Sequence, residues 1–510
     1  MTRVSLAVCL LSLVACGADS PSGGDAAETW VVDTAEVAPP LDTVAPVPDI
    51  IVSAPTAPLD APFPIAVTAG APLTATVTVT VAGVAHPVHL YRGRGSVTLQ
   101  GVAAGALAVS VEGAPRPALL AEARPRREVA GVLSGGDLAW SPDADVVVAA
   151  DASVPAGATL TIAGGTRVLL ADRVNLEIAG ALRAGGGDAA PVLFTASGAA
   201  WGGLRVAPGA TAELDGTWFV AGGGDPGRAF GHSASQPVVW VDGASLIMRG
   251  GGVLDSPGKA FGARDATLSL TDVRVARCDT GGELEATWLT AERLHVSEIP
   301  DADGVIDDDD NDGIYLRGVA TVGGEAVESV LRDCVFAVGE DDGVDHNDAL
   351  VRIERAWIEG FLHEGVAASV GHRVTLVDSV VRGCEQGIEA GYGAPEVVVE
   401  RTTVTDCGAG LRFGDSYDWD DLGSLTVTGS IIYGNDVDVR NFARGLGGPK
   451  PDAITVACSV VGDPAWVGLA GNVAGPPEGA WERGCATGPG LPAAQCTAPL
   501  PGPDCAGAER

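Results

Sequence analysis

A repeat of about 22 residues is the sequence feature that most constrains the fold of this chain. Tripeptides with a central glycine and a final Ile, Val or Leu recur at nearly equal steps through Gly343, Gly365, Gly387 and Gly410, and an earlier copy at Gly313 precedes them by a longer step. Apolar segments between them (VLRDCVF, VRIERAWI, VTLVDSVV and VVVERTTV) keep nearly the same spacing. Because one such unit cannot bury its apolar residues alone, the repeat predicts coils that stack into a solenoid.

Short strands, rather than helices, are expected to form these coils. The 71 glycines, the low aromatic content of 5% and the frequent Val, Thr and Ala favour brief strands closed by tight turns. The period of the repeat, with its x-Gly-Ile/Val strands, resembles the right-handed parallel β-helix of the pectin-lyase-like superfamily over residues 126–445. The resemblance implies an all-β fold with parallel sheets. It leaves the function open, since the superfamily includes lyases, hydrolases, adhesins and inert surface spacers.

The segment Met1–Cys16, MTRVSLAVCLLSLVAC, predicts a secretory signal peptide, because a single arginine is followed by an apolar stretch too short to span a bilayer. The end of this segment, Leu-Val-Ala-Cys, resembles a bacterial lipobox. The resemblance implies cleavage before Cys16 and acylation of this residue, which would anchor the protein in a membrane. Because Gly17 rather than Asp follows, we expect the outer membrane or the cell surface. The alternative is an ordinary signal peptide in which the cysteine is incidental.

Further segments complete the domain organisation. Residues 17–48 are rich in Pro, Ala and Asp and predict an extended tether. Residues 49–125 alternate apolar and polar side chains between glycine turns, which predicts a small, Ig-like β-sandwich. The β-helix of residues 126–445 follows, and residues 446–510 are expected to form a Cys-rich C-terminal cap. The chain is therefore predicted to be all-β, with a small β-sandwich that precedes a right-handed parallel β-helix solenoid.

The formal net charge of −35 restricts the partners that the protein can have. Nucleic acid and anionic lipid surfaces would be repelled by so acidic a protein, and we expect no nucleic-acid partner. Cations, neutral glycans and basic surfaces remain open as partners. We expect the protein to be a monomer.

The segment DADGVIDDDDNDGI, at residues 301–314, concentrates carboxylates that would repel one another without a cation. Equivalent positions of successive coils lie about 4.8 Å apart. Asp312, Asp342 and Glu364, each directly before a repeat glycine, are therefore predicted to form one column. Hard oxygen ligands of this kind suit Ca²⁺, which accepts six to eight of them. The alternative is a solvated acidic face that keeps the protein soluble. The predicted Ca²⁺ ligands are Asp308, Asp310, Asp312, Asp342, Asp345 and Glu364.

Three strings in the same coils, NDGI at Asn311, GEDDG at Gly339 and HEG at His363, resemble motifs of the polygalacturonase family. The resemblance implies glycan hydrolysis by paired carboxylates whose pKa values are pushed apart. The sequence departs from the family pattern in two places. Glu364 separates the histidine from the glycine, which would turn the histidine side chain to the other face of the strand. No Arg-x-Lys occurs around Glu389, where the family binds the substrate carboxylate. The resemblance implies Asp312, Asp341, Asp342 and His363 as candidate catalytic residues.

The segment GDSYDWDDLGS, at residues 414–424, interrupts the repeat and combines two aromatic residues with four aspartates. An aromatic platform with hydrogen-bonding carboxylates suits a sugar. The segment therefore predicts a glycan-binding site at Asp415, Tyr417 and Trp419. The alternative is that the aromatic rings fold back over the edge of a coil.

Eight cysteines remain besides Cys9 and Cys16, an even number that fits an exported protein. Cys384 and Cys407 lie one coil apart at the same phase, so they can form a disulfide or pack as thiols. The tail contains little apolar sequence, and two disulfides there would staple a short cap. The disulfide candidates are Cys384, Cys407, Cys458, Cys485, Cys496 and Cys505.

Together these patterns predict a surface-anchored lipoprotein whose β-helix binds Ca²⁺ and a polysaccharide or another cell-surface component without catalysis. The first alternative is an enzyme that cleaves a polysaccharide, as a polygalacturonase-like hydrolase or as a pectate-lyase-like enzyme. The second alternative is a purely structural spacer. The enzyme hypothesis requires Asp312, Asp341, Asp342 and His363 to converge, whereas the binding hypothesis requires only the cation and an open face.

Overall fold

The computed structural model describes residues 49–300, 310–415, 417, 420–442, 450 and 452–475. The described part of the chain is all β apart from two short 3₁₀ helices, η1 (Gly135–Leu138) and η2 (Pro226–Arg228). None of its helices is long and apolar enough to cross a bilayer. The predicted signal peptide and tether lie outside the described residues, and so do Cys16, Asp308, Trp419, Cys485, Cys496 and Cys505.

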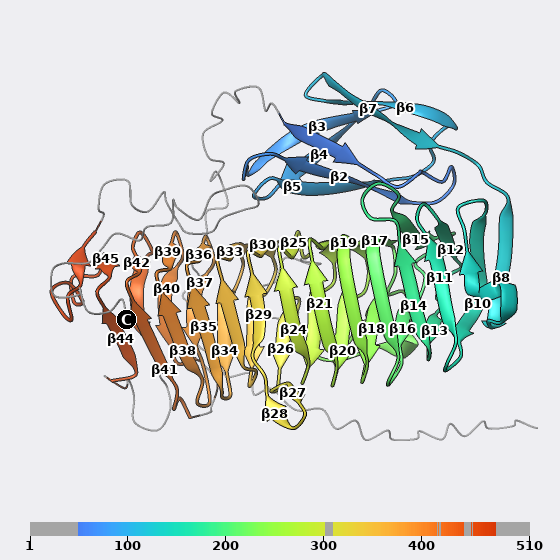
Figure 1. The fold of residues 1–510 in the computed structure, drawn as a ribbon. Coiled ribbons are helices and arrows are strands. Elements are labelled where there is room, and N and C mark those ends of the chain that lie inside the picture. The colour runs from blue at the N-terminus through green and yellow to red at the C-terminus, as the bar shows by residue number, and fades with distance from the viewer. Residues whose placement is uncertain are drawn as a thin grey trace, which may run out of the picture. The chain divides into compact units, whose positions relative to one another are not determined.

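Two antiparallel sheets form the predicted β-sandwich (Figure 1). Its alternating strands bury one side, where Phe63, Ile65 and Val79 are fully enclosed. One sheet contains β1 (Ile50–Ser53), β2 (Phe63–Ala69) and β5 (Arg94–Leu99), and the other contains β4 (Val84–Leu90), β3 (Ala75–Val81), β6 (Gly105–Val111) and β7 (Ala114–Ala121).

Of the other described strands, 37 form the predicted parallel β-helix (Figure 1), in which strands pair in parallel with the equivalent strands of neighbouring coils. The pairings divide these strands into three stacks, which we name sheets A, B and C. The long strands β10 (Asp145–Val154), β17 (Thr211–Val220) and β19 (Ser245–Ser256) bend so that each belongs to two stacks.

Sheet A carries the candidate site. After the second half of β10, it contains β13 (Leu176–Ile178), β16 (Leu204–Val206), β18 (Val239–Asp242), β20 (Phe261–Arg264), β23 (Gly282–Glu285), β26 (Tyr315–Arg317), β31 (Val344–Asn347), β34 (Glu364–Ser369), β37 (Gln386–Ala390), β40 (Ala409–Phe413) and β43 (Val437–Asn441).

Sheets B and C complete each coil. Besides the long strands, sheet B contains β8 (Arg126–Val132), β12 (Arg167–Leu170), β15 (Val192–Ala196), β22 (Arg274–Cys278), β25 (His295–Ser297), β30 (Val335–Gly339), β33 (Trp357–Phe361), β36 (Val380–Arg382), β39 (Thr403–Thr405), β42 (Ile431–Ile432), β45 (Val460–Val461) and β46 (Val473–Ala474). Sheet C contains β9 (Ala139–Trp140), β11 (Thr159–Ala163), β14 (Ala181–Gly185), β21 (Thr267–Thr271), β24 (Trp288–Glu292), β29 (Ser329–Arg332), β32 (Val351–Glu354), β35 (Arg373–Val377), β38 (Glu396–Glu400), β41 (Ser424–Thr428) and β44 (Ile454–Ala457).

Close contact between coils explains the repeat glycines. A Cβ atom on Gly313 would lie 2.4 Å from the carbonyl oxygen of Gly343, and one on Gly343 would lie 2.6 Å from that of Gly365. One on Gly365 would in turn lie 2.7 Å from the carbonyl oxygen of Gly387. Because such distances are shorter than van der Waals contact, only glycine fits at this phase of the repeat.

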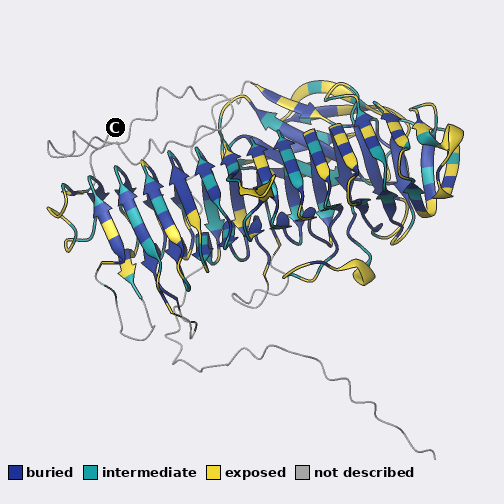
Figure 2. Cartoon of the chain, turned by 60° about the horizontal axis from the view of Figure 1, so that its bottom comes forward, coloured by how far each residue is buried: buried dark blue, intermediate teal, exposed yellow. Residues whose placement is uncertain are grey.

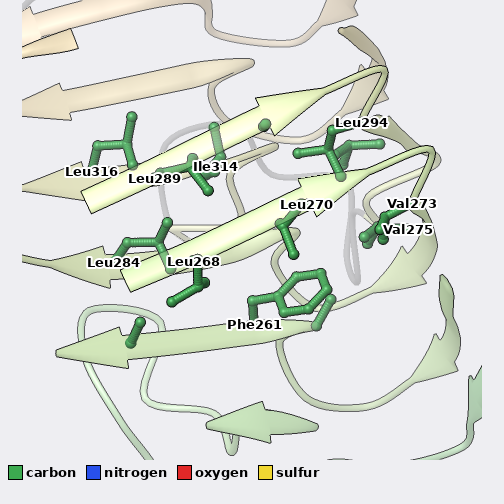
Figure 3. Packing of buried hydrophobic residues seen from close by; sticks show 14 of the residues in the cluster. Phe261, Leu268, Leu270, Val273, Val275, Leu284, Leu289, Leu294, Ile314 and Leu316 are labelled. Atoms are coloured by element: carbon green, nitrogen blue, oxygen red, sulfur yellow. The ribbon is translucent and has the colours of Figure 1, made fainter. Parts of the chain in front are cut away.

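The apolar residue after each repeat glycine explains the rest of the motif. These residues occupy equivalent positions of sheet A and point into the solenoid, where the coils share one continuous core. Figure 2 shows how burial follows the strands, and Figure 3 shows side chains of neighbouring coils in contact within the core. The residues at this position are Ile314, Val344, Val366, Ile388 and Leu411, and each is at most 3% exposed.

Candidate functional site

A column of polar side chains lies at the start of four consecutive strands of sheet A. Pairing of Tyr315 with Asp345 sets Asp312 opposite Asp342, three residues earlier in each coil. Pairing of Val344 with Val366 likewise sets Asp342 opposite Glu364, and Glu364 pairs with Gln386. The predicted column of three carboxyl groups is therefore present, and a glutamine extends it.

Direct hydrogen bonds connect the later members of the column. Gln386 Nε2 donates to Glu364 Oε1 at 2.6 Å, and the Glu364 backbone N–H donates to Asp342 Oδ1 at 2.8 Å. Asp312 is only 2% exposed, and its Oδ1 atom has no hydrogen-bond partner in the part of the chain that the structure describes. A buried acceptor without a donor loses the hydration that it has in water.

Two groups of ligand atoms share Asp342. The carboxylate oxygens of Asp312, Asp342 and Asp345 form one group, with every atom within 4.8 Å of the others. Asp341, Asp342, His363 and Glu364 form the second, with the same spread. We call the six residues of these two groups the acidic cluster; they are Asp312, Asp341, Asp342, Asp345, His363 and Glu364.

Burial and mutual repulsion raise the pKa values in the acidic cluster. The pKa of Asp312 lies well above its usual range, first because the carboxyl group is desolvated and then because Asp345, Asp341 and Asp310 are near. Desolvation also raises the pKa values of Asp342, Asp345 and Glu364. Carboxyl groups in this state either share protons or bind a cation.

The three-carboxylate group meets the requirements of a hard cation. Asp312, Asp342 and Asp345 present oxygen atoms only, which is the donor type that Ca²⁺ prefers. The second group includes an imidazole nitrogen from His363, a ligand that suits transition metals. The donor chemistry of the first group therefore fits Ca²⁺.

His363 lies among the carboxylates, and the expectation that its side chain would turn away is wrong. Its Nδ1 atom lies 2.5 Å from Glu364 Oε2 and 3.1 Å from Asp341 Oδ1. The alternation of faces holds only inside a strand, and β34 begins at Glu364, one residue after the histidine. All four residues that the polygalacturonase resemblance implies, Asp312, Asp341, Asp342 and His363, therefore belong to one cluster.

A cation also lies beside Glu389, although it comes from the following coil. Glu389 pairs with Arg412 across β37 and β40, and Arg412 Nη1 lies 3.0 Å from Glu389 Oε2. The same nitrogen donates to Gln386 Oε1 at 2.5 Å. Arg412 thus reaches the glutamine end of the column, where the sequence motif contains no basic residue.

Asp310 and two residues that the sequence analysis missed border the acidic cluster on its N-terminal side. His232 Nδ1 lies 3.0 Å from Asp310 Oδ2, and this contact raises the pKa of His232. The His232 ring stacks on Tyr315 with the ring centres 5.7 Å apart. His232 belongs to a loop that lies several coils earlier in the chain, and no motif in that loop indicates a site.

The predicted glycan loop borders the acidic cluster on its C-terminal side. Asp415 accepts hydrogen bonds from the backbone N–H groups of Tyr392 at 2.7 Å and Tyr417 at 2.8 Å, which ties the backbone of Tyr417 to that of Tyr392. Tyr417 is 62% exposed, and partial desolvation of its side chain, followed by the charge of Asp415, raises its pKa to about 12. Asp310 and Asp341 contribute to this shift, so the tyrosine lies within electrostatic reach of the acidic cluster. Tyr392, whose ring lies 5.5 Å from that of Tyr417, was also missed.

The described cysteines other than Cys458 are buried free thiols. Pairing of Val380 with Thr403 sets Cys384 opposite Cys407, so the two stack in consecutive coils as expected. They pack as thiols, which is the second of the two expected arrangements. Among the predicted tail cysteines, Cys458 lies within the described residues and is disulfide-bonded. Cys485, Cys496 and Cys505 lie outside them, so the pairing of the tail stays a prediction.

No protein-family model and no curated protein matches this sequence. Several solved structures are distantly similar to this chain. The periplasmic alginate epimerase AlgG is 12% identical, with 62% of this chain and 78% of that chain covered and a TM-score of 0.41. The A-module of the Azotobacter vinelandii mannuronan C-5 epimerase AlgE6 is 13% identical over 65% and 92% of the two chains, with a TM-score of 0.30. The catalytic domain of a GH87 α-1,3-glucanase, in complex with tetrasaccharides, is 9% identical over 80% and 90%, with a TM-score of 0.30. These likenesses concern the fold alone.

Proposed function

We propose that the acidic cluster binds Ca²⁺, and that the bound ion and the neighbouring Tyr417 together bind a polysaccharide or another cell-surface component. The observation that most supports the proposal is the buried Oδ1 atom of Asp312, which has no hydrogen-bond partner among the residues that the structure describes. It belongs to a residue grouped with Asp342 and Asp345 within ligand distance of one ion. A hard cation would give this oxygen a partner and relieve the repulsion among the three carboxylates.

A neutral glycan suits this site best, and so does an acidic glycan whose carboxylates bind to the Ca²⁺ ion. The formal net charge of −35 disfavours polyanions that bind without a metal ion. Tyr417 offers an exposed aromatic ring, and Asp415, which positions it, has a pKa raised to about 6 by burial. In this proposal a lipid anchor at Cys16 holds the protein at the outer membrane or cell surface.

Titration calorimetry with CaCl₂ tests the metal site. We expect the wild-type protein to bind Ca²⁺ and Asp312→Asn to lose binding at least tenfold, because one charged ligand is removed. Asp265→Asn is the matched control, since Asp265 lies in an exposed turn away from the cluster. Equal Ca²⁺ affinity in wild type and Asp312→Asn would contradict the proposal.

Polysaccharide binding with Ca²⁺ or with EDTA tests the glycan part. We expect a bound glycan to be released by EDTA, and Tyr417→Ala to weaken binding while the calorimetric Ca²⁺ signal stays intact. Binding that is identical in EDTA would separate the glycan from the metal and contradict this part of the proposal.

Glycan cleavage is a second candidate function, and the convergence of His363 with Asp341, Asp342 and Glu364 favours it. Carboxyl groups with pKa values raised by burial can protonate a glycosidic oxygen, and ionised neighbours can activate water. Incubation with neutral and acidic polysaccharides, followed by assays for new reducing ends and unsaturated uronates, tests it. Cleavage that Asp342→Asn abolishes would establish an enzyme, and its absence would leave the binding function alone.

A further inference from the structure

A pocket of about 220 Å³ opens on sheet A, separate from the acidic cluster. Its lining includes Trp240 on β18, Arg205 on β16, and Arg228, Gln236 and Pro237 of the loop between β17 and β18. Pockets for drug-sized molecules measure about 300–1,000 Å³, so this one has room for a single ring rather than a long chain.

The pocket and the acidic cluster belong to the same face of the sheet. Cross-strand pairs connect Trp240 to Gly262, Glu283, Tyr315 and finally Asp345. Four strand spacings separate Trp240 from Asp345, which amounts to about 19 Å.

The loop between β17 and β18 lies between the two sites. It packs directly on the sheet at Gly262, where a Cβ atom would lie 2.4 Å from Pro237 Cγ. Further along, the backbone N–H of His232 donates to Glu283 Oε1 at 2.6 Å. The same loop therefore forms a wall of the pocket and, through His232, the N-terminal border of the acidic cluster.

Hydrogen bonds inside the protein preform the pocket wall. Gln236 Nε2 donates to Asn175 Oδ1 at 2.8 Å, and Gln236 Oε1 accepts from the Asp225 backbone N–H at 2.7 Å. Phe230 supports the indole of Trp240 edge to face, with the ring centres 4.4 Å apart. The Nε1 atom of Trp240 is shielded from solvent and has no hydrogen-bond partner among the described residues.

The charges around the pocket do not select an anion. Arg205 Nη2 lies 2.7 Å from Asp242 Oδ2, and Arg228 Nε lies 3.5 Å from Asp225 Oδ2. Each guanidinium group is thus already neutralised, which disfavours a phosphate or carboxylate ligand. A peptide added as an extra strand is also disfavoured, because β18 is already paired on both sides, with β16 and β20.

We propose that this pocket binds one ring of a neutral polysaccharide, as a second sugar site beside the one at the acidic cluster. The proposal rests on the glycan-binding function proposed above. A sugar ring has an apolar face that can lie on the indole of Trp240, and hydroxyl groups that can accept hydrogen bonds from the guanidinium groups of Arg205 and Arg228 in the pocket lining. Two sites about 19 Å apart on one face would hold a single chain more tightly than either site alone.

Binding of the full-length protein to soluble β-glucan, xylan, mannan and galactan, and to their short oligomers, tests the proposal. We expect Trp240→Ala to weaken binding of the recognised polymer about tenfold, because the contact between the sugar ring and the indole is lost. Trp240→Phe, which keeps a ring but removes the N–H, should weaken binding less. Trp288→Ala is the control, because Trp288 is a partly buried tryptophan on a strand of sheet C. The Ca²⁺ affinity should stay unchanged in all three variants, which also verifies that they fold.

The outcomes separate this proposal from the function on which it rests. If Ca²⁺-dependent polymer binding is equal in wild type, Trp240→Phe and Trp240→Ala, the pocket is not a sugar site, although the function at the acidic cluster stands. If polymer binds without Ca²⁺ and depends on Trp240, the pocket is a sugar site and the metal-dependent function is wrong. Binding to none of these neutral polymers would overturn the pocket proposal.

Discussion

Gly365 allows two neighbouring coils to approach closely because it has no side chain. A Cβ atom there would lie 2.4 Å from Val381 Cγ1 and 2.7 Å from the carbonyl oxygen of Gly387. We expect Gly365→Ala to lower the free energy of unfolding by about 1–3 kcal/mol, because the coils must separate or shift to admit the methyl group. Urea unfolding measures this change. Gly136→Ala is the control, since a Cβ at Gly136 meets no atom within 4 Å; equal effects of both substitutions would contradict the close-packing explanation.

His295 makes the stability sensitive to acid. Burial, the largest cause, and then Arg94 and Arg274 lower its pKa to about 3, while its Nε2 atom lies 2.9 Å from the Tyr91 carbonyl oxygen. The unfolded chain takes up this proton near pH 6.5. The stability that the buried neutral His295 contributes is therefore complete above pH 6.5. As the pH falls toward 3, the free energy of unfolding decreases by up to about 1.4 kcal/mol per pH unit.

Unfolding experiments between pH 7 and pH 4.5 measure this dependence. We expect His295→Gln to reduce the difference in stability between the two pH values, and His89→Gln, at an exposed histidine of the sandwich, to leave it as in wild type. A pH dependence that is the same in all three proteins would show that His295 is not its source.

Individual site residues could be predicted only where they follow the repeat. Asp312, Asp342 and Glu364 share one phase of the motif, and sheet A stacks them as expected. The orientation of His363 could not be predicted, because it depends on the residue at which β34 begins. Arg412 could not be predicted as a site residue, since its contact with Glu389 depends on the coil that follows.

Among the structural elements, the loop between β17 and β18 depends on one buried ion pair. Lys259 Nζ contacts the Glu283 carboxylate and donates to the Phe230 carbonyl oxygen at 2.6 Å. We expect Lys259→Met to lower the free energy of unfolding by about 3–5 kcal/mol, because it leaves Glu283 buried without its cation. The double variant Lys259→Met/Glu283→Gln should recover part of this loss in urea unfolding. A double variant less stable than Lys259→Met would contradict the ion-pair explanation.

The conformation of the same loop could not be predicted from the sequence, whereas the strands could. The period predicts strands and their stacking, because those depend on neighbouring coils. A loop that leaves the solenoid has no period, so the position of His232 beside Asp310 could not be predicted. The longer step between Gly313 and Gly343 has a similar origin. It contains the hairpin of β27 (Thr321–Val322) and β28 (Glu325–Ala326), which lies outside sheets A, B and C.

For the whole molecule, the fold class could be predicted because a solenoid repeats one local rule. Each coil needs a glycine where the next coil approaches and an apolar residue that points inward, and both appear at each step of the sequence motif. The pocket at Trp240 could not be predicted, because its walls combine β16, β18 and the loop between β17 and β18. Sites formed by consecutive coils are thus visible in the sequence, whereas sites formed by loops are not.

NaCl and CaCl₂ should raise the melting temperature for different reasons, the first by screening the net charge and the second by binding to the acidic cluster. With a formal charge of −35, the folded protein repels itself, so raising NaCl from about 20 to about 200 mM should raise the melting temperature by screening alone. A specific Ca²⁺ site adds stability by mass action, about 2.7 kcal/mol at a hundred times Kd. We therefore expect CaCl₂ to raise the melting temperature further at the higher NaCl concentration, in wild type and Asp265→Asn but much less in Asp312→Asn. Differential scanning calorimetry measures these shifts. A Ca²⁺ effect that disappears at the higher NaCl concentration, or that is equally large in Asp312→Asn, would mean that calcium acts only as a counterion of the acidic surface.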